Sequence, residues 1–205
     1  MPILILLRHG QSLWNLENKF TGSMDIDLSP HGCQEAAQAG ELLKEYRIDM
    51  AYTSTLIRAV RTLEIILKAL NAKIPVKKII ALNERSYGEL QGLNKAEVEE
   101  KYGNRQYLLW RRSYLSTPPF GESLRDTFQK VVPFYKKEII VQLKQDKNIL
   151  IVAHGNSLRA LIMFLEKIAP KQINEIEIAT ATPRKYCFDS NLRLIEVSYI
   201  TNQKL

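Results

Sequence analysis

The chain has 205 residues, 45% of them hydrophobic and 25% charged, a composition that predicts one globular domain spanning residues 1–205. Lysine and arginine outnumber aspartate and glutamate by 29 to 22, and this charge of +7 suits anionic small molecules, whereas the scatter of the basic residues argues against nucleic acid. The longest apolar run near the start, residues 3–7, is too short for a membrane span, and it lacks the basic leader and small-residue cleavage site of a signal peptide. We therefore expect a cytoplasmic protein without membrane contact.

The first third of the chain alternates between strand and helix patterns. Residues 3–7 form a continuous apolar run, which is typical of a strand buried on both faces. Ser29 and Pro30 indicate a helix start, because serine caps helix N-termini and proline is tolerated in the first turn. One face of that helix is apolar and comprises Ala36, Ala39, Leu42, Leu43 and Tyr46. Residues 48–53 are then predicted to form a strand and residues 56–70 a helix.

The alternation continues through the second half. Residues 74–80 are predicted to form a third strand and residues 148–153 a fourth. Between them, residues 122–145 have a helical pattern that we expect to kink or break at Pro133, because proline removes a backbone donor from the helix. The fourth strand is followed by a predicted helix over residues 157–167.

The end of the chain changes character. Residues 185–200 are predicted to form two strands joined by a turn at residues 189–191, and the main loops are expected at residues 10–28 and 113–121. The whole pattern predicts an α/β fold with three layers, in which a mostly parallel central sheet carries helices on both faces.

Two of the three histidines follow predicted strands. His9 comes after the strand over residues 3–7 and precedes Gly10, and His154 comes after the strand over residues 148–153 and precedes Gly155. Ligands of open α/β sheets bind beyond the carboxyl ends of the strands, so parallel neighbouring strands would bring both imidazoles into one crevice. His31 is expected to be exposed and without a role.

Groups suited to a phosphate accompany these histidines. Arg8 adjoins His9, and Arg58 lies near the start of the helix that follows the second strand. Guanidinium groups match the geometry of a phosphoryl group. Helices beginning near Ser54 and Ser157 would also direct free backbone N–H groups towards the crevice. The sequence therefore predicts an anion site.

Other phosphate and metal chemistries lack their motifs. The chain has no GxxxxGK[ST] nucleotide loop, no GxGxxG after a strand, no HExxH and no GxSxG elbow. Cys33 and Cys187 do not form a CxxC motif, so we expect two partly buried thiols rather than a disulfide or a metal site. Histidine is the only evident nucleophile of the predicted site.

Several motifs in succession resemble one enzyme family. The segment LLRHGQSLWNLENKFTG resembles the signature of the histidine phosphatase superfamily. Further segments resemble its cofactor-dependent phosphoglycerate mutases over nearly the whole chain: AYTSTLIRAVRT, ALNER, SYGELQGLNKAEVEEKYG, WRRS, GESL and AHGNSLRAL. The resemblance implies a phosphoglycerate mutase-like fold.

The resemblance also implies a role for each matching residue. His9 would be the nucleophile that becomes phosphohistidine, while Arg8, Arg58 and His154 would hold the transferring phosphoryl group. Glu84 would act as general acid and base on the substrate hydroxyl. Together with Arg8, Arg58 and Glu84, the remaining matching positions would bind substrate: Ser12, Asn15, Thr21, Gly22, Arg85, Tyr87, Lys95, Arg111, Arg112, Gly155 and Asn156.

The implied reaction interconverts 3-phosphoglycerate and 2-phosphoglycerate, with 2,3-bisphosphoglycerate as the primer and no metal. A homodimer is implied as well. Two alternatives remain open at this point. A phosphatase of the same superfamily would use His9 identically but pass the phosphate to water, and a non-catalytic protein would use the basic crevice to sense a phosphometabolite or RNA.

Three features depart from the family pattern. The connection between Pro119 and Glu122 is short, the sequence ends at Leu205 without the longer tail of many members, and Ser23 stands where a bulky aromatic residue is common. The first two predict a less complete cover over the site, and hence some loss of phosphate to water.

Overall fold

The computed structural model describes residues 1–201, which fold around one six-stranded sheet. Its order is β3-β2-β4-β1-β5-β6, and β5 runs antiparallel to both β1 and β6 while the pairs among β1 to β4 are parallel. The strands are β1 (Ile3–Arg8), β2 (Met50–Thr53), β3 (Val76–Lys78), β4 (Ile149–Ala153), β5 (Arg184–Phe188) and β6 (Leu194–Tyr199). The predicted, mostly parallel α/β architecture is confirmed.

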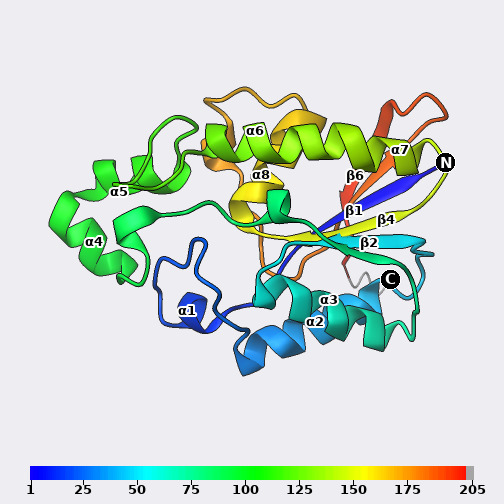
Figure 1. Cartoon of the computed structure of the whole chain (residues 1–205), viewed down its shortest axis with the longest axis horizontal. Coiled ribbons are helices and arrows are strands. Elements are labelled where there is room, and N and C mark those ends of the chain that lie inside the picture. The colour runs from blue at the N-terminus through cyan, green and yellow to red at the C-terminus, as the bar shows by residue number, and fades with distance from the viewer. Residues whose placement is uncertain (202–205) are drawn as a thin grey trace.

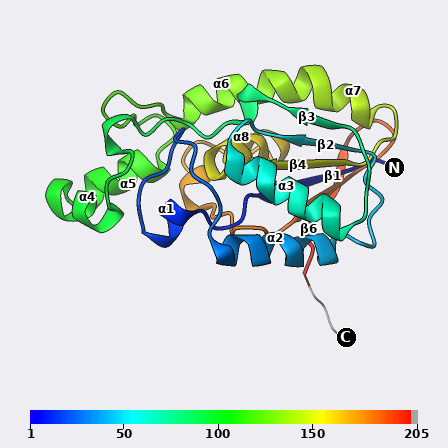
Figure 2. The ribbon, with the colours of Figure 1, turned by 60° about the horizontal axis from the view of Figure 1, so that its bottom comes forward.

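Helices cover both faces of this sheet (Figures 1 and 2). The α-helices of the described residues are α1 (Leu13–Leu16), α2 (Pro30–Leu42), α3 (Ile57–Ala69), α4 (Lys95–Tyr102), α5 (Asn104–Arg112), α6 (Leu124–Phe134), α7 (Ile140–Leu143) and α8 (Gly155–Leu165). Helices α2 and α3 pack on one face over a core that includes Ile5 and Leu7, and α6 and α8 pack on the other over Leu4 and Leu6. Successive residues of β1 thus point into opposite cores, as the period of a strand requires.

The register of β1 and β4 brings the two histidines together. These strands pair in parallel, with Arg8 opposite Ala153, and the His9 amide donates to the Ala153 carbonyl at 3.0 Å. Each strand ends at the same edge of the sheet, so His9 and His154 emerge side by side. This is the neighbourhood that the sequence predicts for them.

Two predicted helices differ from their observed forms. The chain stays helical beyond Pro133, and the expected interruption takes the form of a π-helical turn over Tyr135–Ile139 that links α6 to α7. Proline lacks the donor for the regular i to i−4 bond, and a wider turn accommodates that loss without breaking the helix. Helix α8 begins at Gly155, two residues earlier than predicted, because His154 itself occupies the N-cap.

The predicted strand over residues 74–80 shortens to β3, whose three residues are all exposed at the sheet edge. The turn predicted at residues 189–191 does join β5 and β6. No helix among residues 1–201 has the length and apolar character needed to cross a membrane.

Helices α4 and α5 form an arm beyond the end of the sheet, in a segment for which neither helix nor strand was predicted (Figure 1). Asn94 caps α4, accepting from the Ala96 amide at 2.9 Å, and Gly103 joins the two helices with a φ of +79°. The arm has its own small core, formed by Phe20, Leu90, Val98, Tyr107 and Trp110. The short helix α1 lies in the predicted loop over residues 10–28.

Candidate active site

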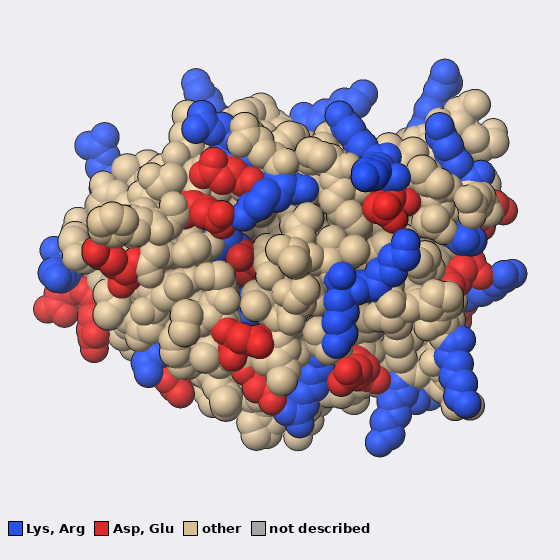
Figure 3. Space-filling view, in the orientation of Figure 1, with Lys and Arg blue, Asp and Glu red and all other residues tan. Residues whose placement is uncertain are grey.

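A cavity of about 590 Å³ lies between the carboxyl ends of β1 and β4 and the arm of α4 and α5. Seven lysine or arginine side chains line it, against two carboxylates. On the face shown in Figure 3, by contrast, basic side chains are spread out and interspersed with acidic ones. The cavity is therefore a focus of positive charge in a surface of mixed charge.

His9 lies at the closed inner end of this cavity and is 4% exposed. Its Nδ1 lies 2.6 Å from the Gly10 carbonyl, which can only accept, so Nδ1 carries the proton and donates. The other nitrogen, Nε2, keeps its lone pair and accepts from Arg58 Nε at 3.3 Å. Burial, followed by the charges of Arg58 and Arg8, holds the pKa of His9 well below its usual value. His9 is consequently a neutral imidazole with a free nucleophilic nitrogen.

His154 stands beside His9, with ring centroids 5.0 Å apart, but lies just behind the cavity wall and is fully buried. Its Nε2 lies 2.7 Å from Ser54 Oγ. Burial and then Arg58 lower the pKa of His154 well below its usual value, so this ring is neutral too. Burial of both rings next to two arginines is what keeps them uncharged.

Arg58 and Arg8 are held in place by backbone carbonyls. Arg58 donates to the carbonyls of Gly22 at 2.8 Å and Met24 at 2.7 Å, which ties the loop after α1 to the inner end of the cavity. Arg8 donates to the Ile178 carbonyl at 2.8 Å. Burial lowers the pKa of Arg58 to about 10, so it is still cationic at neutral pH. Both guanidinium groups are thus fixed before any ligand arrives.

Three buried polar atoms around the cavity lack a hydrogen-bond partner within residues 1–201. They are Arg8 Nε, Thr21 Oγ1 and His154 Nδ1. Buried polar groups in proteins are nearly always paired, and each group left unpaired costs free energy. Such a set of unpaired atoms around a neutral nucleophile is expected where a polyoxyanion completes the hydrogen bonds.

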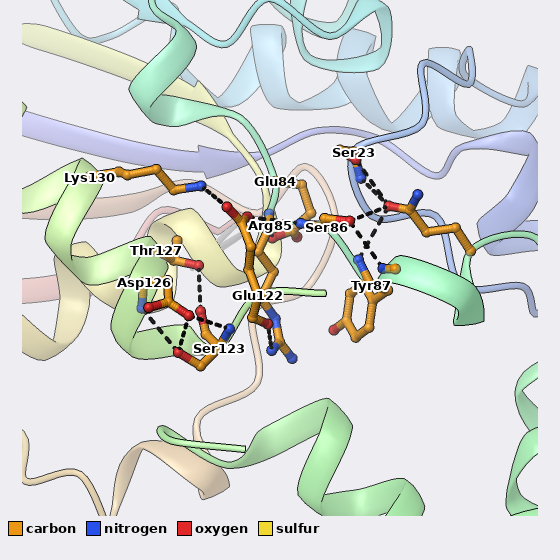
Figure 4. Close-up of polar contacts among 12 residues, drawn as sticks. Ser23, Glu84, Arg85, Ser86, Tyr87, Glu122, Ser123, Asp126, Thr127 and Lys130 are labelled. Carbon is orange, nitrogen blue, oxygen red and sulfur yellow. Dashed lines mark hydrogen bonds and ion pairs between the residues drawn. The ribbon is translucent and has the colours of Figure 1, made fainter. Parts of the chain in front are cut away.

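Glu84 places a carboxylate at the side of the cavity. Its Oε2 accepts from the Asn156 amide at 3.2 Å, and its Oε1 accepts from the Arg85 amide at 3.0 Å. Figure 4 shows Glu84 at the start of the segment that continues to Tyr87. A carboxylate in this position can exchange a proton with a bound oxygen.

Together, a neutral imidazole nucleophile, flanking guanidinium groups and a nearby carboxylate suit phosphoryl transfer. The nucleophile can form an N–P bond, and the arginines can balance charge on the equatorial oxygens. The comparisons point the same way, because residues 4–199 match the family model of the histidine phosphatase superfamily (branch 1). The chain belongs to this superfamily.

Individual relatives place the chain more closely. A 2,3-bisphosphoglycerate-dependent phosphoglycerate mutase of Cytophaga hutchinsonii is 57% identical over 200 residues, covering 98% of this chain and 94% of the relative. One of Nitrobacter hamburgensis is 51% identical and covers 90% of each chain. A mycobacterial glucosyl-3-phosphoglycerate phosphatase, solved as a complex with VO3, matches with a TM-score of 0.83 at 25% identity, covering 97% of this chain and 98% of that one.

The outer wall of the cavity is formed by the arm. Lys95, Arg111 and Arg112 line it, and Arg111 donates to the Tyr107 hydroxyl at 2.6 Å. Burial, followed by the charges of Arg111 and Arg8, lowers the pKa of Lys95 to about 8. Arg112 pairs with the carboxylate of Glu177 across the cavity. The outer wall thus carries three cations but already holds one competing carboxylate.

Most residues predicted for the site do line the cavity: Arg8, His9, Asn15, Thr21, Gly22, Arg58, Glu84, Tyr87, Lys95, Arg111, Arg112, Gly155 and Asn156. Gly22 has a φ of +55°, and a Cβ there would collide with Gln91 Oε1 at 2.2 Å, so this turn requires glycine. Ser23, in place of the expected aromatic residue, donates its hydroxyl to the same Gln91 oxygen at 3.0 Å (Figure 4).

Two predicted substrate-binding residues are placed elsewhere. Ser12 is fully buried and caps α1, its Oγ accepting from the Asn15 amide at 3.2 Å. Arg85 is also fully buried, outside the cavity lining, and donates to the backbone, including the Glu122 carbonyl at 2.6 Å (Figure 4). Neither side chain lines the cavity, and their contact with substrate remains a prediction.

Sequence reasoning missed several lining residues, namely Lys19, Phe20, Arg159, Ile176, Glu177, Ile178, Ala179, Thr182, Tyr199 and Thr201. The first three lie inside the recognised motifs, so their position in those motifs could have identified them as candidate site residues. The segment 176–182 has no motif, and its contacts with the site include the bond from the Ala181 amide to the Arg8 carbonyl at 2.8 Å. Within residues 1–201, no residue of the predicted loop 113–121 lines the cavity. Residues 202–205, the end of the tail, are not among the described residues.

Proposed function

We propose that this chain is a 2,3-bisphosphoglycerate-dependent phosphoglycerate mutase that interconverts 3-phosphoglycerate and 2-phosphoglycerate. The observation that carries the proposal is the neutral His9 Nε2 at the inner end of a cavity with seven cationic side chains. Relatives of that name at 46–57% identity over most of the chain support it.

In the proposed mechanism, His9 Nε2 attacks the phosphorus of 2,3-bisphosphoglycerate. The N–P bond forms as the bond to the substrate oxygen breaks, and Glu84 supplies the proton that this oxygen takes up. Arg8 and Arg58 balance the charge on the phosphoryl oxygens, and the neutral His154 adds a hydrogen-bonding nitrogen beside them. The 2-hydroxyl of 3-phosphoglycerate then attacks the phosphohistidine, with Glu84 taking its proton, and 2,3-bisphosphoglycerate forms again. This bisphosphate turns within the site, gives its 3-phosphate to His9 and leaves as 2-phosphoglycerate.

The charged lining of the cavity suits the proposed primer. A glycerate with two phosphates and one carboxylate needs cations at both ends, which the inner arginines and the arm residues Lys95, Arg111 and Arg112 provide. The unpaired Arg8 Nε, Thr21 Oγ1 and His154 Nδ1 would find acceptors or donors on its oxygens. The proposal includes no metal, because these side chains balance the transferring charge.

A phosphatase acting on a phosphoglycerate-containing substrate is the second candidate. It is favoured by the structural match to the mycobacterial glucosyl-3-phosphoglycerate phosphatase. In that enzyme class the phosphohistidine would pass its phosphate to water instead of a second hydroxyl. Incubation with 3-phosphoglycerate and a trace of 2,3-bisphosphoglycerate separates the two candidates, since a mutase forms 2-phosphoglycerate and a phosphatase releases inorganic phosphate.

The chemical step is tested by mixing the protein with 2,3-bisphosphoglycerate and measuring acid-labile, base-stable phosphate on it. We expect one phosphate per active chain, absent from His9→Ala. His31→Ala is the matched control, because it removes an exposed histidine whose side chain lies outside the cavity. Phosphate on His154 instead, or a phosphoenzyme that persists in His9→Ala, contradicts the assignment.

A cytoplasmic homodimer completes the proposal, as expected for a glycolytic and gluconeogenic mutase. The exposed edge strand β3 leaves backbone groups that a second copy could pair. Light scattering at assay concentrations measures the oligomeric state directly, and a monomeric mass in the active preparation contradicts this part of the proposal.

A further inference from the structure

The last turn of α5 is the feature that carries the inference. Its final regular bond runs from the Ser113 amide to the Leu109 carbonyl at 3.1 Å. The next three carbonyls, of Trp110, Arg111 and Arg112, have no intrahelical partner, as at the end of any α-helix. The same three residues include both arginines of the outer cavity wall, so whatever satisfies these carbonyls also fixes the direction of those side chains.

Arg85 supplies the donors for the first two carbonyls. Its Nη2 donates to the Trp110 carbonyl at 2.5 Å and to the Arg111 carbonyl at 3.4 Å, while Nη1 donates to the Glu122 carbonyl at 2.6 Å. The side chain is completely buried. Its guanidinium thus joins the end of α5 to the residue just ahead of α6.

Arg159 supplies the donor for the third carbonyl from the opposite side. Its Nη2 donates to the Arg112 carbonyl at 3.3 Å and to the Ile173 carbonyl, and Nη1 donates to Asn156 Oδ1 at 3.4 Å. Arg159 is 5% exposed and extends from α8, the helix whose N-cap is His154. Burial, followed by the charge of Arg112, lowers its pKa to about 10, so it is still a cation at neutral pH.

We propose that Arg85 and Arg159 are positioning residues that jointly cap the C-terminus of α5 and thereby hold Arg111 and Arg112 in the orientation that binds substrate. The proposal rests on the proposed function only in naming the ligand as a phosphoglycerate. Neither residue is a catalytic residue here, because each acts through backbone carbonyls and not through the reacting atoms.

Two features distinguish this arrangement from ordinary packing. Both guanidinium groups are buried with Nε unpaired within residues 1–201, which costs free energy that an apolar residue would avoid. Both also start from elements of the inner site, since Arg85 follows Glu84 in sequence and Arg159 contacts Asn156. The caps therefore connect the substrate-binding arm to the carboxylate and to the helix that carries His154.

The first test replaces Arg159 by Gln and by Lys and measures KM and kcat for 3-phosphoglycerate, with the active fraction counted by phosphoenzyme. We expect KM to rise about ten- to a hundredfold in Arg159→Gln, because a small misplacement of binding groups costs that much, with a smaller change in kcat. Arg159→Lys keeps the charge and reaches one carbonyl, so its KM should lie between those of the wild type and Arg159→Gln. A loss of active fraction with unchanged KM in both variants would overturn the proposal.

A double-mutant cycle separates positioning from direct contact, since Arg159 also lines the cavity. If Arg159 acts through Arg112, then Arg159→Gln should raise KM much less in an Arg112→Ala background than in the wild type. The same relation is expected for Arg85→Gln in an Arg111→Ala background. Full additivity in both cycles would mean that each arginine acts independently of α5, and would overturn the proposal.

Chemical rescue gives a second readout that a purely structural loss would not show. Millimolar guanidinium added to Arg159→Ala should lower KM towards the wild-type value, whereas sodium chloride at equal ionic strength should not. Arg184→Gln is the matched control for removing a partly buried arginine, because Arg184 pairs with Glu166 away from α5. We expect Arg184→Gln to lower Tm without raising KM, and an equal rise in KM there would overturn the proposal.

Failure of the mutase function and failure of the positioning role of Arg85 and Arg159 give different results. The same cycles can be run as dissociation constants for 3-phosphoglycerate by calorimetry, which needs no turnover. A wild-type protein that binds 3-phosphoglycerate but forms no 2-phosphoglycerate would contradict the mutase function while leaving the positioning role testable. Normal formation of 2-phosphoglycerate together with additive double-mutant cycles would support the mutase function and contradict the positioning role.

Discussion

The inner and outer regions of the cavity differ in how deeply their charged and titratable side chains are buried. The inner region consists of His9, Arg58 and His154, with His9 only 4% exposed and the other two at most 1%. The outer region consists of Lys95, Arg111 and Arg112, and the Arg112 side chain is 23% exposed beside a Glu177 side chain that is 77% exposed. Burial lowers the pKa of each inner group and also that of Lys95, whereas Arg112 in the outer region forms an ion pair with an exposed carboxylate.

The comparison shows why one cavity can hold both a nucleophile and a charged substrate. A histidine nucleophile must be neutral, and burial beside two arginines lowers its pKa to achieve this. Cations that bind a substrate must instead stay charged and accessible. Placing them on an arm outside the sheet, capped by Arg85 and Arg159, meets that need without exposing the inner region to water.

The largest effect is expected at Glu84, which lies between the two regions. Glu84→Gln keeps the hydrogen bond from the Asn156 amide but cannot carry the proton, so kcat should fall by about a hundred- to ten-thousandfold. Stopped-flow and steady-state assays measure this, with Tm as the control for folding. Near wild-type kcat in Glu84→Gln would remove this carboxylate from the proposed mechanism.

Acid stability probes the inner region alone. The folded pKa values of His9 and His154 are well below the unfolded value near 6.5, so the unfolded chain binds more protons once the pH falls below that value. Stability is therefore complete above about pH 6.5 and declines as the pH falls below it, by up to about 1.4 kcal/mol per pH unit for each histidine.

Denaturant unfolding between about pH 7 and pH 5 measures this slope. Replacing His9 and His154 together by Gln should flatten it, and His31→Ala serves as the control for removing a histidine. A slope that persists after both buried histidines are gone would show that other groups cause the acid sensitivity.

Alkaline pH probes the outer region. The pKa of Lys95 is about 8 in the empty site, so its charge is lost as the pH rises through that value. We expect KM for 3-phosphoglycerate to rise by roughly tenfold between about pH 7 and pH 9, since one cation opposite the substrate anion is lost. Lys95→Arg keeps the charge and should make KM less dependent on pH. A wild-type KM that stays constant over this range contradicts the prediction.

The smallest effect is expected at Glu177, whose carboxylate pairs with Arg112 in the empty site. An anionic substrate must share or displace this partner, so Glu177→Gln should lower KM by about two- to fivefold, the range of an exposed ion pair. Added salt should reduce the difference between variant and wild type. An increase in KM would mean that Glu177 helps to orient Arg112 instead of competing for it.

The sequence by itself predicted the α/β class, the position of both histidines directly after apolar strands, and many of the residues that line the cavity. Apolar runs such as residues 3–7 are local signals, and a strand buried on both faces has few alternative forms. The motifs around His9, Glu84 and His154 likewise lie in contiguous stretches. Local patterns of this kind can be recognised before the fold is known, because neighbouring residues in the sequence both form the secondary-structure element and supply the functional group.

Only the tertiary structure decided how distant segments complete the site. Nothing near Glu177 in sequence indicates that it meets Arg112, and no motif separates Arg85, buried under α5, from Arg111 at the cavity wall. Likewise Ser12 became a helix cap and Pro133 was accommodated by a π-helical turn. These outcomes depend on which backbone carbonyls and charges other elements bring close, and on how deeply packing buries them, quantities that no single segment of the sequence contains.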